Sequence, residues 1–137
     1  MFTSPANRAA AAYRTLDLQG HLDGASPHQL VQMLFDALTV SLGAARRAML
    51  AGDVELKGRH LGKAVRLIEE GLKGGLDMQR GGELAGNLRG LYDYCVQRLT
   101  HANLHNDEAA VAEVVGLLEP VAQAWKSIAG QPPAAGA

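Results

Sequence analysis

The sequence predicts an all-α protein: an antiparallel up-down four-helix bundle, with an N-terminal arm and a C-terminal tail outside it. Four segments repeat apolar residues at the helical period of 3.6, and each has its own boundary residues. Short turns join the segments, which favours antiparallel neighbours. The 137 residues are 47% apolar but only 4% aromatic. Such an aliphatic core suits packed helices better than a β-sandwich.

The first helix is expected to begin after Ser26 and to end at about residue 51. Ser26 suits the N-cap, Pro27 suits the first helical position, and Gln29 lies three residues after the cap. This is the pattern of a capping box. One face then carries the apolar residues Val31, Leu34, Phe35, Leu38, Leu42, Ala45 and Met49. Asp53 can cap the helix that follows.

The second helix, expected over residues 54–76, has more apolar surface than one core face requires. Its core stripe consists of Leu61, Val65, Ile68 and Leu72, and a second stripe consists of Leu56, Leu67 and Met78 with Gly71 and Gly74 beside them. A second stripe indicates a wider core, self-association or a groove for another helix. The helix also contains several glycines, each destabilising by roughly 1 kcal/mol in a helix interior, so its last turn is expected to fray.

The third helix is expected to start near Gly82, and its core face consists of Leu84, Leu88, Leu91, Cys95, Leu99 and Ala102. The glycine pair before it could suggest a phosphate-binding loop. However, no strand precedes the pair, no Lys-Ser or Lys-Thr follows it, and Glu83 stands where a phosphate would bind. We therefore interpret Gly81-Gly82 as a corner. Asn103 is expected to end this helix and Asn106 to cap the next.

The fourth helix carries Val111, Val114, Val115, Leu118, Ala122 and Trp125 on its core face. Leu117, Val121 and Ile128 form a second apolar stripe on it. Pro120 removes one backbone hydrogen bond, and because the core face resumes in phase at Trp125, we expect a kink rather than a break. Residues 1–20 are predicted to be an arm, 21–129 the bundle and 130–137 a tail.

Charge and cysteine content indicate which kinds of partner and site this chain is suited to. Thirteen basic and fourteen acidic side chains give a net charge of −1 without a basic block, which disfavours binding to nucleic acid. Cys95 is the only cysteine, so the chain has neither a disulfide framework nor a cysteine-based zinc site. The sequence shows no signal peptide and no run long enough to span a membrane. These features predict a cytoplasmic protein that does not insert into a membrane.

The candidate catalytic groups do not form a recognisable set. His101 and His105 have the i, i+4 spacing of helical metal ligands, but no Glu follows His101 and the helix is expected to end between them. Cys95 lies on a core face, where a thiol is usually inert packing. We predict that the protein is not an enzyme. A metal-dependent bundle enzyme using the two histidines stays as an alternative, as does a generic helical adaptor or dimerisation protein.

Several ordered motifs resemble the flagellar secretion chaperone family FliS. These are Ala12-Tyr13-Arg14 in the arm, Ser26-Pro27, the turn Gly52-Asp53, Gly81-Gly82-Glu83 with Asn87-Leu88, "LYDY" at 91–94, "RLTHAN" at 98–103, and Asn106-Asp107. The similarity covers about residues 12–128. Pro120 and the glycines of the second helix depart from the pattern but touch none of these motifs.

The resemblance implies an export chaperone without cofactor or metal. Such a chaperone binds the disordered C-terminal segment of flagellin, prevents premature polymerisation and keeps flagellin competent for the flagellar type III export gate. The resemblance also implies an arm that covers the groove when flagellin is absent, with Tyr13 contributing to binding. We expect flagellin to contact Tyr13, Leu16, Leu56, His60, Leu67, Gly71, Met78, Tyr94 and Leu117, on a chain that is a monomer or a weak homodimer.

Overall fold

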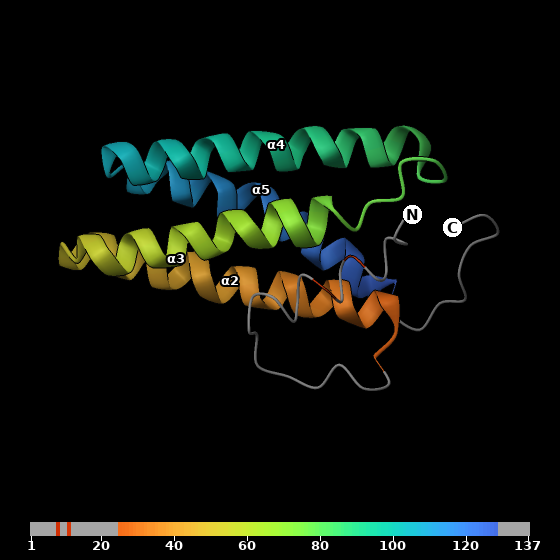
Figure 1. Cartoon of the computed structure of the whole chain (residues 1–137), viewed down its shortest axis with the longest axis horizontal. Coiled ribbons are helices and arrows are strands. Elements are labelled where there is room, and N and C mark those ends of the chain that lie inside the picture. Colours follow the sequence, from red (N-terminus) through yellow and green to blue (C-terminus); the bar gives the residue numbers. More distant parts are fainter. Residues whose placement is uncertain (1–7, 9–10, 12–24, 129–137) are drawn as a thin grey trace.

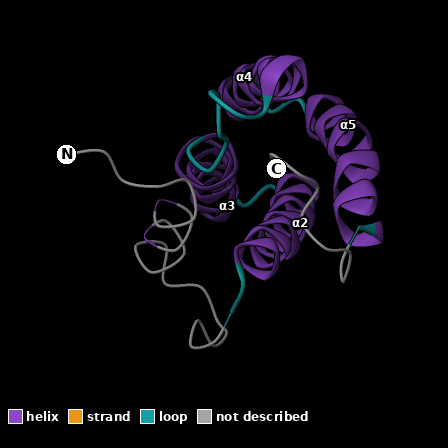
Figure 2. Cartoon of the chain, turned by 90° about the vertical axis from the view of Figure 1, so that its right-hand side faces the viewer, coloured by secondary structure: helices purple, strands orange, loops and turns teal. Residues whose placement is uncertain are grey.

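The computed structural model describes residues 25–128 together with Arg8 and Ala11, and this part of the chain is a four-helix bundle without strands (Figure 1). The helices are α2 (Pro27–Ala51), α3 (Val54–Arg66), α4 (Gly82–His105) and α5 (Glu108–Ser127), and a π-helical segment η1 (Leu67–Lys73) continues α3. Successive helices run antiparallel around a common axis, so each packs against two neighbours (Figure 2). The predicted fold class is confirmed. The predicted arm and tail lie almost wholly outside the described residues.

The predicted caps of the first two helices are confirmed. The Gln29 backbone N–H donates to Ser26 Oγ at 3.1 Å, and the Ser26 backbone N–H donates to Gln29 Oε1 at 2.8 Å. Pro27 occupies the first turn. Gly52 ends α2 in the left-handed conformation, with φ of 74°, and the Asp53 carboxylate then accepts the Leu56 N–H at 3.1 Å. These caps supply partners for helix-end N–H groups that would otherwise have none.

The second helix changes its hydrogen-bonding pattern before it ends. From residue 67 it widens into η1, whose last cap bond runs from the Gly74 N–H to the Glu69 carbonyl, five residues back. A Cβ on Gly71 would lie 3.1 Å from the Leu34 methyl groups, so this glycine allows α2 to approach η1 closely. Lys73 then binds Asp93 of α4 at 2.6 Å. The helix is thus distorted in its last turns, but it is held on two sides.

The glycine pair before α4 forms the predicted corner. Asp77 Oδ1 accepts the N–H groups of Gln79 and Arg80, and Gly82 has a φ of 54°. The prediction that Leu84 points into the core is wrong: Leu84 is 67% exposed, whereas the next residue, Ala85, is the buried one of this turn at 4%.

The end of α4 also differs from the prediction. Asn103 is helical and α4 continues to His105, so the left-handed residue is Asn106 and the N-cap of α5 is Asp107. The buried Lys57 ammonium binds this end of α4. It donates to the Asn103 carbonyl at 3.0 Å and to Asn106 Oδ1 at 3.4 Å, where the helix dipole favours a cation.

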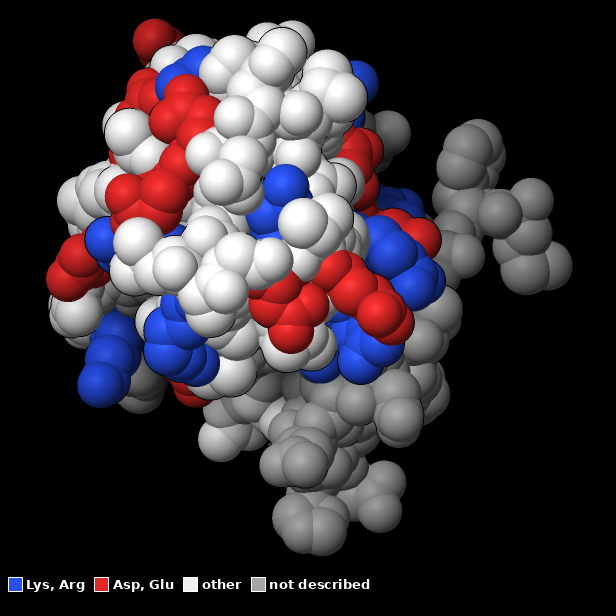
Figure 3. Space-filling model, turned by 90° about the vertical axis from the view of Figure 1, so that its left-hand side faces the viewer, with Lys and Arg blue, Asp and Glu red and all other residues white. Residues whose placement is uncertain are grey.

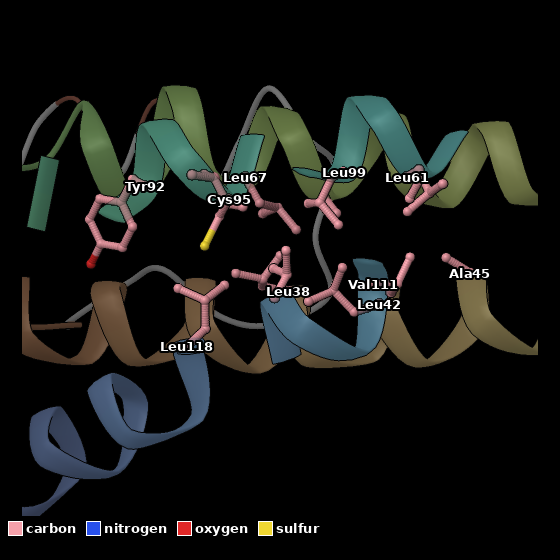
Figure 4. Packing of buried hydrophobic residues seen from close by; sticks show 14 of the residues in the cluster. Leu38, Leu42, Ala45, Leu61, Leu67, Tyr92, Cys95, Leu99, Val111 and Leu118 are labelled. Carbon is pink, nitrogen blue, oxygen red and sulfur yellow. The ribbon is translucent and has the colours of Figure 1, made fainter. Parts of the chain in front are cut away.

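The core lies along the bundle axis, and all four helices contribute to it (Figure 4). Figure 4 shows Leu38 and Leu42 of α2 facing Leu99 of α4, with Val111 and Leu118 of α5 closing one side. Cys95 is buried in this cluster, as predicted. Pro120 lies within a continuous α5, which confirms that it does not break the helix.

Candidate partner-binding surface

The second apolar stripe predicted for residues 54–76 does not lie on the surface as a unit. Leu67 is 0% exposed and belongs to the core cluster, and Gly71 is buried against Leu34. The prediction that these two residues form an outer groove is wrong, because the face that carries them packs toward α2. Of the interpretations left open, the wider core is therefore correct for this part of the stripe.

The remaining predicted contact residues lie on different elements and are not brought together. Leu56 in the first turn of α3, Met78 before α4, and Tyr94 in the middle of α4 are 38%, 43% and 41% exposed. His60 and Leu117 are half-buried. A single small ligand cannot touch all of these residues, whereas an extended chain that follows the bundle surface can.

Among the described residues, Arg8 of the predicted arm contacts the end of the second helix. Tyr13 and Leu16 lie outside the described residues. Arg8 Nε donates to the Gly74 carbonyl at 2.5 Å, which joins the N-terminal part of the chain to the residue just after η1. Gly74 lies four residues before the exposed Met78.

The seam between α4 and α5 is closed by polar contacts. Glu113 accepts the Tyr94 hydroxyl at 2.5 Å and Arg98 Nε at 2.8 Å, and His101 Nε2 lies 3.2 Å from Asp107 Oδ2. The bond from Tyr94, followed by the bond from Arg98, lowers the pKa of Glu113. The same bond raises the pKa of the Tyr94 hydroxyl, because it favours the protonated phenol.

The seam between α5 and α2 contains a groove of about 380 Å³. We call it the α2/α5 groove; it is lined by Gln32, Phe35, Asp36, Leu38, Thr39, Leu42, Gly43 and Arg46 of α2 and by Val115, Leu118, Glu119, Ala122, Gln123 and Lys126 of α5. Its volume falls in the range of roughly 300–1,000 Å³ that is usual for ligand pockets. The groove combines an apolar floor with polar and charged residues at the rim.

Both ends of the α2/α5 groove are fixed. At one end, Arg46 Nε binds Glu108 Oε1 at 2.6 Å. At the other end, the His28 and Trp125 rings stack at 4.6 Å and 7°. Trp125 Nε1 donates to the His28 carbonyl at 3.0 Å, and His28 Nε2 donates to the Trp125 carbonyl at 2.8 Å. The groove is therefore a gap between two helices that are held together at its ends.

Our interpretation of the sequence did not identify this groove. A signal was present, since Thr39 and Gly43 border the core face of their helix and Ala122 is a small residue on the core face of the fourth helix. Small residues there leave space instead of filling it. Which helices would lie opposite each other could not be read from the spacing within either helix.

His101 and His105 are both on α4, contrary to the expected end at Asn103, and their rings lie 4.5 Å apart. His101 is already directed at Asp107, which caps α5. Within the described part of the chain, no three His, Cys, Asp or Glu side chains are grouped so that they could hold a metal ion. The arrangement is that of a contact between helices.

Cys95 is poorly suited to nucleophilic chemistry. Burial raises the pKa of its thiol to about 11, with a smaller contribution from the Glu113 carboxylate. The thiolate, which is the reactive form, is therefore scarce near neutral pH. Burial likewise raises the pKa of Tyr92 to about 12. Both groups act as core side chains.

The charged residues visible at one end of the bundle are of both signs and interspersed (Figure 3). No single-sign patch of the kind that tracks a phosphate backbone is seen on this face. None of the helices over residues 25–128 is long and apolar enough to cross a membrane.

Comparison with known proteins gives a consistent match. The family model described as flagellar protein FliS matches residues 9–132. The flagellar secretion chaperone FliS of Salmonella typhimurium is 50% identical over 117 residues, which cover 85% of this chain and 87% of that protein. FliSB of Pseudomonas aeruginosa is 40% identical over 90% of this chain and 97% of its own length. FliS of Escherichia coli is 41% identical over 88% and 89%.

Proposed function

The chain belongs to the FliS family of flagellar secretion chaperones, and from this premise we propose that it binds the C-terminal segment of flagellin in the cytosol before export. Binding covers a segment that would otherwise polymerise, and it delivers flagellin to the flagellar type III export gate. The role requires a surface for an unfolded client and needs neither catalysis nor a cofactor. The family match over most of the chain is the observation that carries the proposal.

The distribution of exposed apolar side chains supports this role. Leu56 lies in the first turn of α3, Met78 in the turn before α4 and Tyr94 in the middle of α4, so a partner that contacts all three must extend along these two neighbouring helices. Disordered segments that fold on binding cover such large, discontinuous surfaces. The ordering of the segment opposes binding and keeps the affinity moderate, which suits a client that is later released.

The N-terminal arm is expected to regulate access of flagellin to this surface. Arg8 holds the N-terminal part of the chain against Gly74, close to Met78 in sequence. We propose that the arm covers the apolar surface when flagellin is absent and is displaced when flagellin binds, and that Tyr13 and Leu16, which follow Arg8, then contact flagellin in the complex. Removal of the arm would then strengthen the first contact of a client peptide, whereas loss of Tyr13 alone would weaken the final complex.

The test is calorimetric titration with a peptide of the last forty or so residues of flagellin, a length that provides several helical anchors of a few turns each. Met78→Asp and Leu56→Asp should each weaken binding about tenfold, since burial of one such side chain contributes roughly 1.5–3 kcal/mol. Both residues are exposed, so the circular dichroism spectrum should not change. Leu67→Asp is unsuitable as a test, because it would place a charge in the core.

Leu104→Asp is the matched control. Leu104 is a large apolar residue that is more exposed than Leu56 or Met78, and it is not among the proposed contacts. Wild-type titration heats from Met78→Asp and Leu56→Asp would contradict the proposed surface. A chain that ignores the flagellin peptide and has twice the chain mass at every concentration would instead be the generic dimerising adaptor.

A further inference from the structure

The α2/α5 groove has features that the flagellin surface proposed above does not use. We propose that it binds an amphipathic helical segment of a partner protein, one that carries a lysine or arginine beside its apolar face. This inference stands on the groove itself and does not depend on the contacts proposed for Leu56, Met78 and Tyr94.

The shape of the groove fits a short helix. The lining residues of α2 run from Gln32 to Arg46, a span of about 20 Å at 1.5 Å per residue. Buried Phe35, Leu38 and Leu118 form its floor. A helix of about four turns laid along this floor would place apolar side chains at i, i+3, i+4 and i+7 against it.

Small residues allow a helix to approach closely. Thr39 and Gly43 lie one turn apart on the α2 side, and Ala122 lies on the α5 side. A Cβ on Gly43 would meet only the distant end of the Arg47 side chain, at 3.5 Å. The space beside Gly43 is therefore not filled by the described part of the chain itself.

The charges at the rim indicate the sign of the partner. Asp36 and Glu119 have no cationic partner among the described residues, and Asp36 accepts only the Gln32 amide, at 3.2 Å. Arg46, the nearest cation on α2, is already paired with Glu108. Lys126 stands at the His28–Trp125 end. A basic side chain on the partner would therefore meet two unpaired carboxylates near the middle of the groove.

The probe for the test is an acetylated, amidated and fluorescein-labelled 14-residue Ala/Leu helix with one central lysine beside its leucine stripe. We expect saturable binding to the full chain by fluorescence anisotropy at low salt. A peptide with glutamate in place of that lysine should bind about tenfold more weakly, since attraction to Asp36 and Glu119 becomes repulsion. Glu119→Lys in the protein should reduce or reverse this preference.

Two glycine variants separate the groove from other surfaces. Gly43→Leu places a side chain in the groove and should abolish binding, while the gain in helix propensity preserves the fold. Gly62→Leu is the control, because Gly62 lies on the exposed face of α3 with open space around it and outside the groove. Absence of saturable binding, equal affinity for the two peptides, or wild-type binding by Gly43→Leu would overturn the proposal.

Discussion

The two sides of α5 are packed in different ways. Toward α4, Glu113 joins Tyr94 and Arg98, and Asp107 meets His101, so polar contacts recur along the seam. Toward α2, the ion pair and the stacked rings of the described residues lie at the two ends, and a groove with an apolar floor lies between them. The seam between α5 and α4 is thus closed by polar contacts, whereas the seam between α5 and α2 has a groove. This groove is the place where another helix can bind.

Side-chain size explains the difference. On the α2 side, the groove is bordered by Thr39, Gly43 and Ala122, which do not reach across the gap. On the α4 side, long side chains do reach across. The comparison shows that a bundle with a complete core can still leave surface for a partner, provided that its helices are fixed elsewhere.

The largest expected effects come from truncating core leucines on the two sides. Leu99→Ala removes a fully buried side chain between helices and should lower the free energy of unfolding by about 3–4 kcal/mol. Leu118→Ala, on the floor of the α2/α5 groove, should lower it by only about 2–3 kcal/mol, because the new space opens into the groove instead of forming a closed cavity. Urea denaturation measures both. Equal losses would mean that the two seams are packed alike.

A smaller effect is expected where His28 and Trp125 fix the groove. Trp125→Phe keeps a ring against His28 but removes the Nε1 donor, and loss of one such hydrogen bond should lower stability by about 1 kcal/mol. Hydrogen exchange should become faster in the last turns of α5 and stay unchanged in α4. Faster exchange throughout α4 would show that the end contact supports the whole bundle and not this seam alone.

The smallest effect is expected at the α4/α5 seam and depends on pH. The pKa of Glu113 is lowered in the folded state, so its contribution is complete above the unfolded pKa of about 4.3 and is lost as the pH falls through the folded pKa. The Tm difference between wild type and Glu113→Gln should therefore persist at neutral pH and disappear in acid. The Tyr94 pKa should fall in the same variant.

Glu119→Gln is the control for this experiment. Glu119 is an exposed carboxylate of the same helix, on the opposite seam, without a cationic partner in the described structure. Its replacement should leave the pH dependence of Tm unchanged. If both variants changed the pH dependence of Tm alike, general surface charge, and not the Tyr94–Glu113–Arg98 contact, would cause the fall of Tm at low pH.

Local signals in the sequence predicted most of the fold. Ser26, Asp53 and the corner at Gly81-Gly82 act within a few residues of their own position, and all three were predicted correctly. The errors arose where the local structure depends on a side chain that is distant in sequence. The end of α4 is bound by Lys57, which lies 46 residues away from Asn103 in sequence, and no local pattern contains that contact.

The candidate surface was harder to predict for the same reason. Apolar spacing showed that residues 54–76 have two stripes, but it could not show that Gly71 would meet Leu34 and remove part of the second stripe from the surface. The α2/α5 groove needs the relative placement of two helices that are distant in sequence, as the Arg46–Glu108 separation of 62 residues illustrates. Exposure depends on tertiary neighbours, which the spacing within one helix does not encode.

The π-helical segment η1 has a consequence for how chains of this family can vary in length. A π-turn holds one residue more than the α-turn that it replaces, so deletion of a single residue within 67–73 would restore α-helical periodicity and keep the residues on either side in register. Elsewhere in the helices, the same deletion would rotate a core face by about 100°. We therefore expect single-residue insertions and deletions among related chains to concentrate at this segment.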